Sequence, residues 1–146
     1  MLPEVWGKSA WSFFHFVTLG YPENPTEDDK KKYFEYVQML QYVLPCSKCR
    51  KNLTNHLKKY PLTKKALSNR TSFVKWGIDL HNIVNYHINK PMLTYAEAME
   101  QISKLSEQNK KSSIKPIYYV LLVVAIIIIC FIIYYVLKNR GNLTVI

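Results

Sequence analysis

Residues 72–89, SFVKWGIDLHNIVNYHIN, carry the clearest structural pattern in this chain of 146 residues. Phe73, Trp76, Leu80 and Val84 recur at intervals of three and four residues, which places them on one face of an α-helix. No segment of the chain alternates apolar and polar residues convincingly, as a half-buried strand does. The sequence therefore predicts an all-α protein in which this helix supplies a core-facing stripe.

Two helices are expected before the first cysteine. Gly20 and the prolines that follow it separate a helix over residues 3–19 from a second helix, which Thr26 caps. Pro45 ends the second helix and lets a third begin at the cysteines and continue to about residue 59. The expected buried stripes are Trp6, Ala10, Phe13, Phe14 and Val17 in the first helix and Phe34, Val37, Leu40 and Leu44 in the second.

A short fifth helix is expected after the quoted segment. Pro91 ends the fourth helix, and the pair Thr94 and Glu97 forms a capping-box pattern that opens a helix to about residue 108. The predicted head is therefore a four-helix bundle with a short fifth helix.

The segment Ile117–Leu137 contains no charged residue, glycine or proline and is long enough to cross a bilayer. Tyrosines at both of its ends suit the two membrane interfaces, and Cys130 in its middle is expected to be inert. The expected parts are the helical head domain over 1–108, a polar linker over 109–116, a transmembrane helix over 117–137 and a short basic tail over 138–146.

The formal net charge of +10 is partly explained by cations on either side of this span, where anionic lipid headgroups lie. These cations are Lys110, Lys111, Lys115, Lys138 and Arg140. The excess of lysine in the head is not interleaved with aromatic residues along a basic stripe, so we expect no nucleic-acid partner.

Cys46 and Cys49 stand at the expected start of the third helix. Cysteines with this spacing can close a small disulfide ring, and the helix N-terminus with Lys48, Arg50 and Lys51 favours the thiolate that thiol–disulfide exchange requires.

Two other interpretations of the cysteine pair stay open at this point: half of a zinc site, and a coincidence. A zinc site usually has four ligands, and the chain contains no second CxxC. His56 with His81 or His87 could complete a set, but the spacing fits no common zinc motif.

Two polar clusters are candidates for ligand binding. His81, Asn82 and Asn85 fall on one face of the fourth helix, which indicates either a bound polar ligand or a solvated face. Lys8, Trp11 and His15 share a face of the first helix, and this combination suits a planar anionic ligand, although a lone tryptophan is more often part of a core.

The chain resembles the Erv/ALR family of FAD-linked sulfhydryl oxidases over about residues 3–95. The compact form is most similar to single-domain members encoded by large DNA viruses. Five motifs in order carry the resemblance: Trp6-Gly7-Lys8-x-x-Trp11-x-x-x-His15, Tyr21-Pro22-x-x-Pro25-Thr26, Pro45-Cys46-x-x-Cys49, Phe73-x-x-Trp76-x-x-x-x-His81-Asn82-x-Val84-Asn85, and Lys90-Pro91.

The resemblance implies a flavin enzyme that forms protein disulfides with oxygen as acceptor and yields hydrogen peroxide. Cys49 matches the cysteine beside the isoalloxazine, and Cys46 matches the cysteine that exchanges with substrate thiols. The positions that match those lining FAD are Lys8, Trp11, His15, His81, Asn82, Asn85 and Lys90. No metal is implied.

The family also implies a homodimer and thiol-bearing protein partners. The second, shuttle cysteine pair of many relatives is missing, so we expect a thioredoxin-like CxxC carrier to deliver electrons to Cys46. Leu44 replaces a frequent aromatic residue before Pro45, and the fifth helix lacks the tryptophan that relatives often place near the adenine.

The alternative functions are a flavin-free thiol exchange protein, which predicts a βαβ pattern around the cysteine pair, and a zinc-stabilised non-catalytic membrane adaptor.

A span close to the C-terminus, with no signal peptide, predicts a single-pass anchor with the head in the cytosol. Two glycosylation sequons, at Asn52 and Asn69, would be available if the head were lumenal instead.

Overall fold

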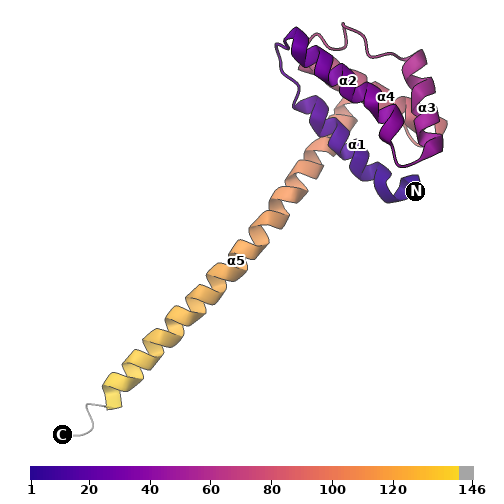
Figure 1. Cartoon of the computed structure of the whole chain (residues 1–146). Coiled ribbons are helices and arrows are strands. Elements are labelled where there is room, and N and C mark those ends of the chain that lie inside the picture. Colours follow the sequence, from indigo (N-terminus) through magenta and orange to yellow (C-terminus); the bar gives the residue numbers. More distant parts are fainter. Residues whose placement is uncertain (142–146) are drawn as a thin grey trace. The chain divides into compact units, whose positions relative to one another are not determined.

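The computed structural model describes the backbone of residues 1–141 and the side chains of residues 1–107 and 117–139. It divides into two compact units, Met1–Ser103 and Lys104–Ile146. The described residues form helices and contain no strand, which confirms the all-α prediction (Figure 1). The helices are α1 (Pro3–Leu19), α2 (Glu27–Val43), α3 (Ser47–Lys59), α4 (Arg70–His87) and α5 (Tyr95–Gly141).

Side-chain caps start α2 and α5 where the sequence indicates. The Thr26 hydroxyl accepts the Asp29 N–H at 3.1 Å, and the Asp29 carboxylate accepts the Thr26 N–H at 2.9 Å, which completes a capping box at α2. Thr94 and Glu97 make the same reciprocal pair at α5, with 3.3 Å and 2.8 Å between the bonded atoms. Both predicted caps are confirmed.

The fourth helix lies two residues earlier than expected. Asn69 caps it by accepting the Ser72 N–H at 2.8 Å, so the helix includes Arg70 and Thr71. It ends at His87 because Asn89, with a φ of 55°, is in the left-handed region that cannot continue a right-handed helix.

In the first unit α1 packs against α4, and α2 packs against α3. Gly77 permits a close approach of α1 to α4, because a Cβ there would lie 3.2 Å from side-chain atoms of both Phe14 and Thr18. The buried apolar cluster draws on α1 to α4, the α1–α2 loop and the α3–α4 turn: Phe14, Tyr21, Val37, Leu53, Leu57, Leu62, Leu67, Phe73, Trp76 and Leu80. Phe73, Trp76 and Leu80 confirm most of the predicted α4 stripe, while Val84 is half-buried.

Two predicted core residues are wrong. Phe13 is 63% exposed and Phe34 is 41% exposed. The α1 face at the Gly77 approach is centred on Phe14 and Thr18, which turns Phe13 outward. On α2 the aromatic contacts with the core come from Tyr33 and Tyr36 and leave Phe34 on the outer side.

The turn between α3 and α4 is held by polar bonds to buried aromatic residues. The buried Tyr21 hydroxyl donates to the Leu67 carbonyl at 2.9 Å, and Arg70 Nε donates to the Tyr21 carbonyl at 2.6 Å. The ring of Tyr60 stacks on Trp76 with 6.1 Å between centroids, and its hydroxyl donates to Asp79 at 2.9 Å. These bonds give the irregular backbone partners that it would otherwise lack.

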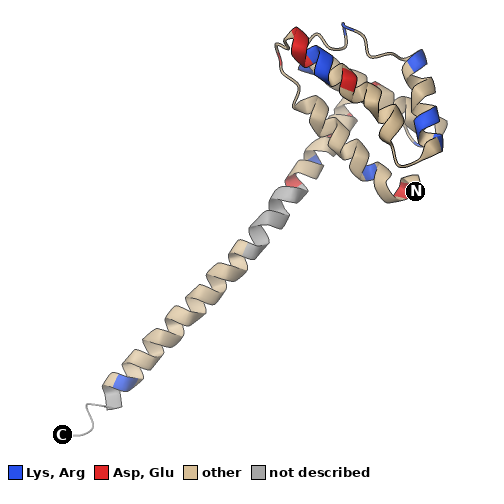
Figure 2. Ribbon diagram, viewed as in Figure 1, with Lys and Arg blue, Asp and Glu red and all other residues tan. Residues whose placement is uncertain are grey.

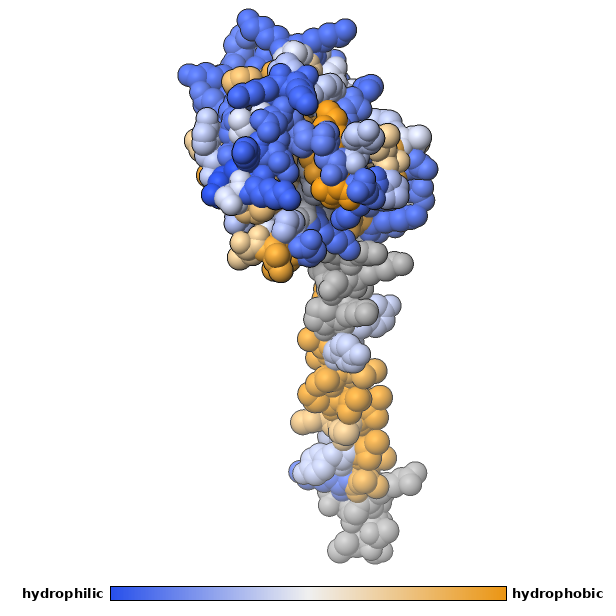
Figure 3. All heavy atoms as spheres, turned by 90° about the vertical axis from the view of Figure 1, so that its right-hand side faces the viewer, coloured by the Kyte–Doolittle hydropathy of each residue, from blue (hydrophilic) through white to orange (hydrophobic). Residues whose placement is uncertain are grey.

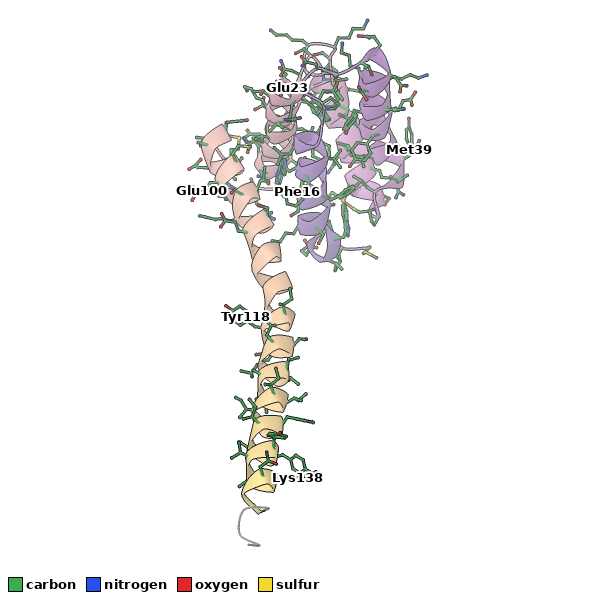
Figure 4. All side chains as sticks on the ribbon, turned by 90° about the vertical axis from the view of Figure 1, so that its left-hand side faces the viewer. Phe16, Glu23, Met39, Glu100, Tyr118 and Lys138 are labelled. Carbon is green, nitrogen blue, oxygen red and sulfur yellow. A yellow bond between two sulfur atoms is a disulfide. The ribbon has the colours of Figure 1, made fainter. Side chains whose placement is uncertain are left out.

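The second unit consists of the rest of α5. Its segment Ile117–Asn139 has a mean hydropathy of 3.3 and is long and apolar enough to cross a membrane. No charged side chain interrupts the described stretch before Lys138 (Figure 2). Tyr118 and Lys138 mark the two ends of this stretch in Figure 4.

The backbone of α5 stays helical through residues 109–116, where we expected a polar linker after a helix ending near residue 108. A polar composition alone does not end a helix, because lysine and glutamine have good helix propensities. The side chains of this stretch lie outside the described part of the chain, as do Lys110, Lys111, Lys115 and Arg140.

Replacing Tyr21 with phenylalanine should destabilise the head. The ring is fully buried and its hydroxyl is bonded to the Leu67 carbonyl, so Tyr21→Phe leaves a buried acceptor without its donor and should cost about 1–3 kcal/mol of unfolding free energy. Tyr42→Phe is the control, because Tyr42 is 69% exposed. Denaturant unfolding of the detergent-solubilised chain measures both changes. An equal loss in the two variants would contradict the assigned role of Tyr21.

Candidate functional site

Cys46 and Cys49 form a disulfide at the N-terminus of α3, with 5.1 Å between their Cα atoms. Cys46 is the N-cap of the helix, and its sulfur accepts the Cys49 N–H at 3.1 Å. The pair predicted from its spacing is therefore joined in the structure.

The turn that presents the disulfide is fixed from two sides. Helix α2 ends at Val43 because Leu44 leaves the helical region ahead of Pro45. Arg50 Nη1 donates to the Leu44 carbonyl at 2.5 Å, and the terminal ammonium of Met1 donates to the Pro45 carbonyl at 3.4 Å. Arg50, which the sequence analysis gave as positive charge favouring the thiolate, thus also satisfies a carbonyl at the end of α2.

The surroundings of the disulfide are cationic. Helix α3 contains no acidic residue, and Lys48 and Lys51 are exposed on its first turns. The positive end of the helix dipole and these lysines stabilise negative charge on a sulfur released from the disulfide.

The two sulfurs have different positions relative to the core. Cys49 precedes Leu53 by four residues and Leu57 by eight, and both leucines are buried, so Cys49 lies on the inward face of α3. Cys46 lies at the tip of the helix, before its first residue. This difference favours attack by an incoming thiol at Cys46.

A cluster of rings joins α1 to α4. Trp11 stacks on His81 with 3.9 Å between ring centroids and 7° between planes. His15 Nε2 and His81 Nδ1 share a hydrogen bond of 2.9 Å. The structure thus brings together three of the predicted site residues from segments far apart in the sequence.

Burial lowers the pKa of both His15 and His81 to about 4, so both rings are neutral at pH 7. His15 Nδ1 is buried and has no hydrogen-bond partner. The same is true of Trp6 Nε1 on the same helix. Because buried polar atoms are nearly always paired, the unpaired His15 nitrogen beside His81 indicates a place where a polar ligand can bind, whereas Trp6, nine residues earlier, lies on the opposite face of α1.

Three further predicted site residues, Asn82, Asn85 and Lys90, lie in the C-terminal part of α4 and just after it. The Asn82 amide donates to the Leu93 carbonyl at 2.8 Å and accepts the Leu93 N–H at 2.9 Å, which ties the α4–α5 loop to α4. Asn85 is buried, and its carbonyl accepts the Lys90 N–H at 2.8 Å. The positive charge of Lys90 contributes to the lowered pKa of His81, after burial and His15.

Lys8 is exposed on α1 and lies outside the ring cluster. Two features escaped the sequence reasoning: the unpaired Trp6 nitrogen and the Asn82–Leu93 bonds. Trp6 stands in the Trp6-Gly7-Lys8 motif, which was the available signal, whereas no pattern in the sequence pairs Asn82 with Leu93.

The four histidines form two separate pairs. His56 and His87 lie together, with 4.7 Å between ring centroids, while His15 pairs with His81. Within the side chains that the structure describes, no three groups of the types that ligate metals lie close enough to hold an ion. Cys130 is a free, exposed cysteine in the apolar part of α5.

Comparison with known proteins agrees with this geometry. The model of the Erv1 / Alr family matches residues 8–108. A probable FAD-linked sulfhydryl oxidase of Acanthamoeba polyphaga mimivirus is 54% identical over 142 residues, which is 97% of this chain and 99% of the relative. A putative FAD-linked sulfhydryl oxidase of Invertebrate iridescent virus 6 is 33% identical and covers 68% of this chain and 93% of its own length.

Solved structures show the same fold. The FAD-binding domain of Erv1 from Saccharomyces cerevisiae matches with a TM-score of 0.59 at 26% identity, over 64% of this chain and 87% of that one. The yeast Erv1 core matches with a TM-score of 0.58 at 25% identity, over 64% of this chain and 76% of that one. With a family match over most of the head and a relative that shares more than half of its residues, the chain belongs to the Erv1/Alr family.

Proposed function

We propose that the protein is an FAD-dependent thiol oxidase, which converts pairs of protein thiols into disulfides and passes the electrons to oxygen, yielding hydrogen peroxide. The observation that carries this proposal is the Cys46–Cys49 disulfide at the N-terminus of α3, in a bundle of the Erv1/Alr family. The similar viral and yeast proteins are FAD-linked sulfhydryl oxidases by name.

The residues between α1 and α4 fit a flavin. The parallel, stacked rings of Trp11 and His81 offer an aromatic surface, and the unpaired nitrogen of His15 offers a hydrogen bond. Lys8 and Lys90 supply positive charge for phosphate. We assign FAD binding to Lys8, Trp11, His15, His81, Asn82, Asn85 and Lys90, with Asn82 acting through the loop that it ties to α4. When bound, FAD supplies the two-electron acceptor that oxygen reoxidises.

The exchange steps follow from the positions of the two sulfurs. A substrate thiolate attacks the Cys46 sulfur, a new S–S bond forms, and the Cys46–Cys49 bond breaks with its electron pair on Cys49. A second substrate thiolate then attacks the substrate sulfur of this mixed disulfide, which releases the product disulfide and a Cys46 thiolate. The helix dipole, Lys48 and Lys51 stabilise both leaving thiolates.

Serine variants of the two cysteines should separate their roles. Cys46→Ser and Cys49→Ser should each abolish thiol oxidation, because neither can form the disulfide. Long-wavelength flavin absorbance on partial reduction should persist in Cys46→Ser and vanish in Cys49→Ser, since only Cys49 lies on the inward face of α3. The reverse pattern would exchange the two assignments. Cys130→Ser, in the apolar part of α5, should leave turnover unchanged.

A thioredoxin-like carrier with its own CxxC is the proposed electron donor. The chain has one cysteine pair in its head, so electrons must enter at Cys46 directly. In Cys49→Ser, the Cys46 thiolate can attack the disulfide of an oxidised carrier, so that one carrier sulfur bonds to Cys46 and the other is released as a thiolate. No Cys49 is left to resolve this mixed disulfide from the enzyme side, and such complexes should accumulate in cells. Recovery of a CxxC protein supports the carrier, whereas recovery of diverse client proteins alone supports direct oxidation.

Homodimerisation through α1 and α2 is also proposed. An open apolar depression lies between these helices, lined by Phe13, Val17, Tyr33, Tyr36 and the stem of Lys32. Phe13 is largely exposed, and a contact with a second copy would bury it. Sedimentation of the detergent-solubilised chain should return a dimer, and a monomer at all concentrations would oppose this.

We further propose that α5 anchors the protein in a host or virion membrane with the head in the cytosol. Deletion of residues 117–137 should move the protein from the membrane fraction to the soluble fraction while flavin stays bound, because the span is apolar and entirely exposed. Persistence in the membrane fraction would contradict the anchor. A glycosidase-sensitive mass shift at Asn52 or Asn69 would place the head on the lumenal side instead.

Acidification should weaken the α1–α4 contact. The pKa of His15 and of His81 falls from 6.5 to about 4 on burial, so the folded state is favoured by their neutral forms. The contribution of the two neutral histidines to the free energy of unfolding is complete above pH 6.5 and is lost as the pH falls toward 4. The flavin-free His15→Gln/His81→Phe variant should lose stability less steeply over this window than the unaltered apoprotein. The denaturant midpoint, measured at several pH values, gives the slope of stability against pH for each protein. His87→Gln is the control, because His87 is exposed. Identical slopes in all three proteins would contradict the prediction.

A further inference from the structure

The ends of three helices meet around the disulfide. Helix α2 ends just before it, and α3 begins with it. The N-terminus of α1 is held at the same turn by the bond from the Met1 ammonium to the Pro45 carbonyl. In Figure 1 the N-terminus and the α2–α3 turn accordingly lie on the same side of the head.

Large apolar side chains are exposed on the two helix ends that flank this turn. The charge of helix α2 is confined to its N-terminal half: residues 27–32 are all charged, whereas residues 36–43 carry no charge. Figure 3 faces this side and shows apolar groups interrupting a hydrophilic surface, and Met39 lies on the outer side of α2 in Figure 4. We call these six residues the apolar rim: Met1, Leu2 and Val5, exposed by 70–75%, and Met39, Tyr42 and Val43, exposed by 55–69%.

The third side of the turn is cationic. Lys48 and Lys51 are exposed, and neither takes part in an ion pair within the part of the chain that the structure describes. Glu4, exposed between Leu2 and Val5, is the one acidic residue within the two segments that carry the rim (1–5 and 39–43), and α3 has none. The surface around Cys46 is thus apolar on two sides and positive on the third.

We propose that the apolar rim, with Lys48 and Lys51, is a docking surface for a cysteine-bearing segment of the protein substrate in which large apolar residues and an acidic residue flank the cysteine. Charge complementarity selects the acidic residue, and the exposed rim selects the apolar ones. This inference rests on the proposed thiol oxidase function. A small dithiol needs access to the disulfide alone, so its oxidation does not depend on the rim.

The test compares substrates on the full, FAD-loaded chain in detergent. The substrates are dithiothreitol and synthetic two-cysteine peptides whose flanking residues are either Leu, Phe and Asp or Ser, Gly and Lys. With the unaltered protein, kcat/KM for the apolar acidic peptide should exceed that for the polar basic peptide by about tenfold or more, which corresponds to about 1.4 kcal/mol. This comparison requires no mutation, so a folding defect cannot obscure it.

Variants then show which residues cause the preference for the apolar acidic peptide. Val5→Ser/Tyr42→Ser/Val43→Ser should lower kcat/KM for the apolar acidic peptide about tenfold and leave dithiothreitol oxidation within about twofold. Phe34→Ser is the control, because Phe34 is an exposed apolar residue on the outer side of α2 that belongs neither to the rim nor to the residues assigned to FAD. Lys48→Glu/Lys51→Glu should lower the ratio of peptide to dithiothreitol kcat/KM, whereas Lys58→Glu/Lys65→Glu should not.

The outcomes distinguish this inference from the function on which it rests. If the unaltered chain does not oxidise dithiothreitol, the thiol oxidase proposal fails, and the docking surface fails with it. If dithiothreitol is oxidised but the two peptides react equally, the docking surface alone is overturned. If the rim variant changes sedimentation but not peptide kinetics, the rim is a contact between copies of the chain, and the proposal is likewise overturned.

Discussion

The break in the helical chain at Pro45 is the constraint on which the rest of the head depends. It ends α2 and frees Cys46 to cap a new helix, so the disulfide lies at a positive helix terminus rather than within a helix. Arg50 bonds to the Leu44 carbonyl and supports this geometry. Without the break, both sulfurs would lie along a continuous helix, and neither would meet the dipole that stabilises a thiolate.

The second requirement is the close contact between α1 and α4. Gly77 lets Phe14 and Thr18 approach α4, and the same register brings Trp11 and His15 against His81. His15 is buried, both histidines are neutral at pH 7, and the Nδ1 atom of His15 has no hydrogen-bond partner, which is costly for a buried polar atom. A flavin that supplies the missing hydrogen bonds would relieve this cost, so ligand binding and packing of the bundle support each other.

Much of this architecture follows from local sequence signals. The period of residues 72–89, the break at Pro45 and the caps at Thr26 and Thr94 depend on neighbouring residues, and they appear in the structure, whereas α4 ends at His87, ahead of the break expected at Pro91. Features that depend on the rotation of one helix against another were not predictable in this way. Phe13 and Phe34 are apolar and occur at helical spacing, yet they face outward. Which face of α1 or α2 is buried depends on the helices packed against it, and these are distant in the sequence. The bond between Asn82 and Leu93 and the role of Arg50 likewise depend on tertiary contacts.

An anaerobic titration of the purified full chain with dithiothreitol, followed by admission of oxygen, tests the central claim most directly. If flavin lies beside Cys46 and Cys49, the protein is yellow as purified, and the dithiol bleaches the flavin spectrum. Oxygen then restores the spectrum and yields hydrogen peroxide in an amount equal to the dithiothreitol disulfide formed. A colourless protein, or a flavin spectrum that the dithiol leaves unchanged, would contradict the account.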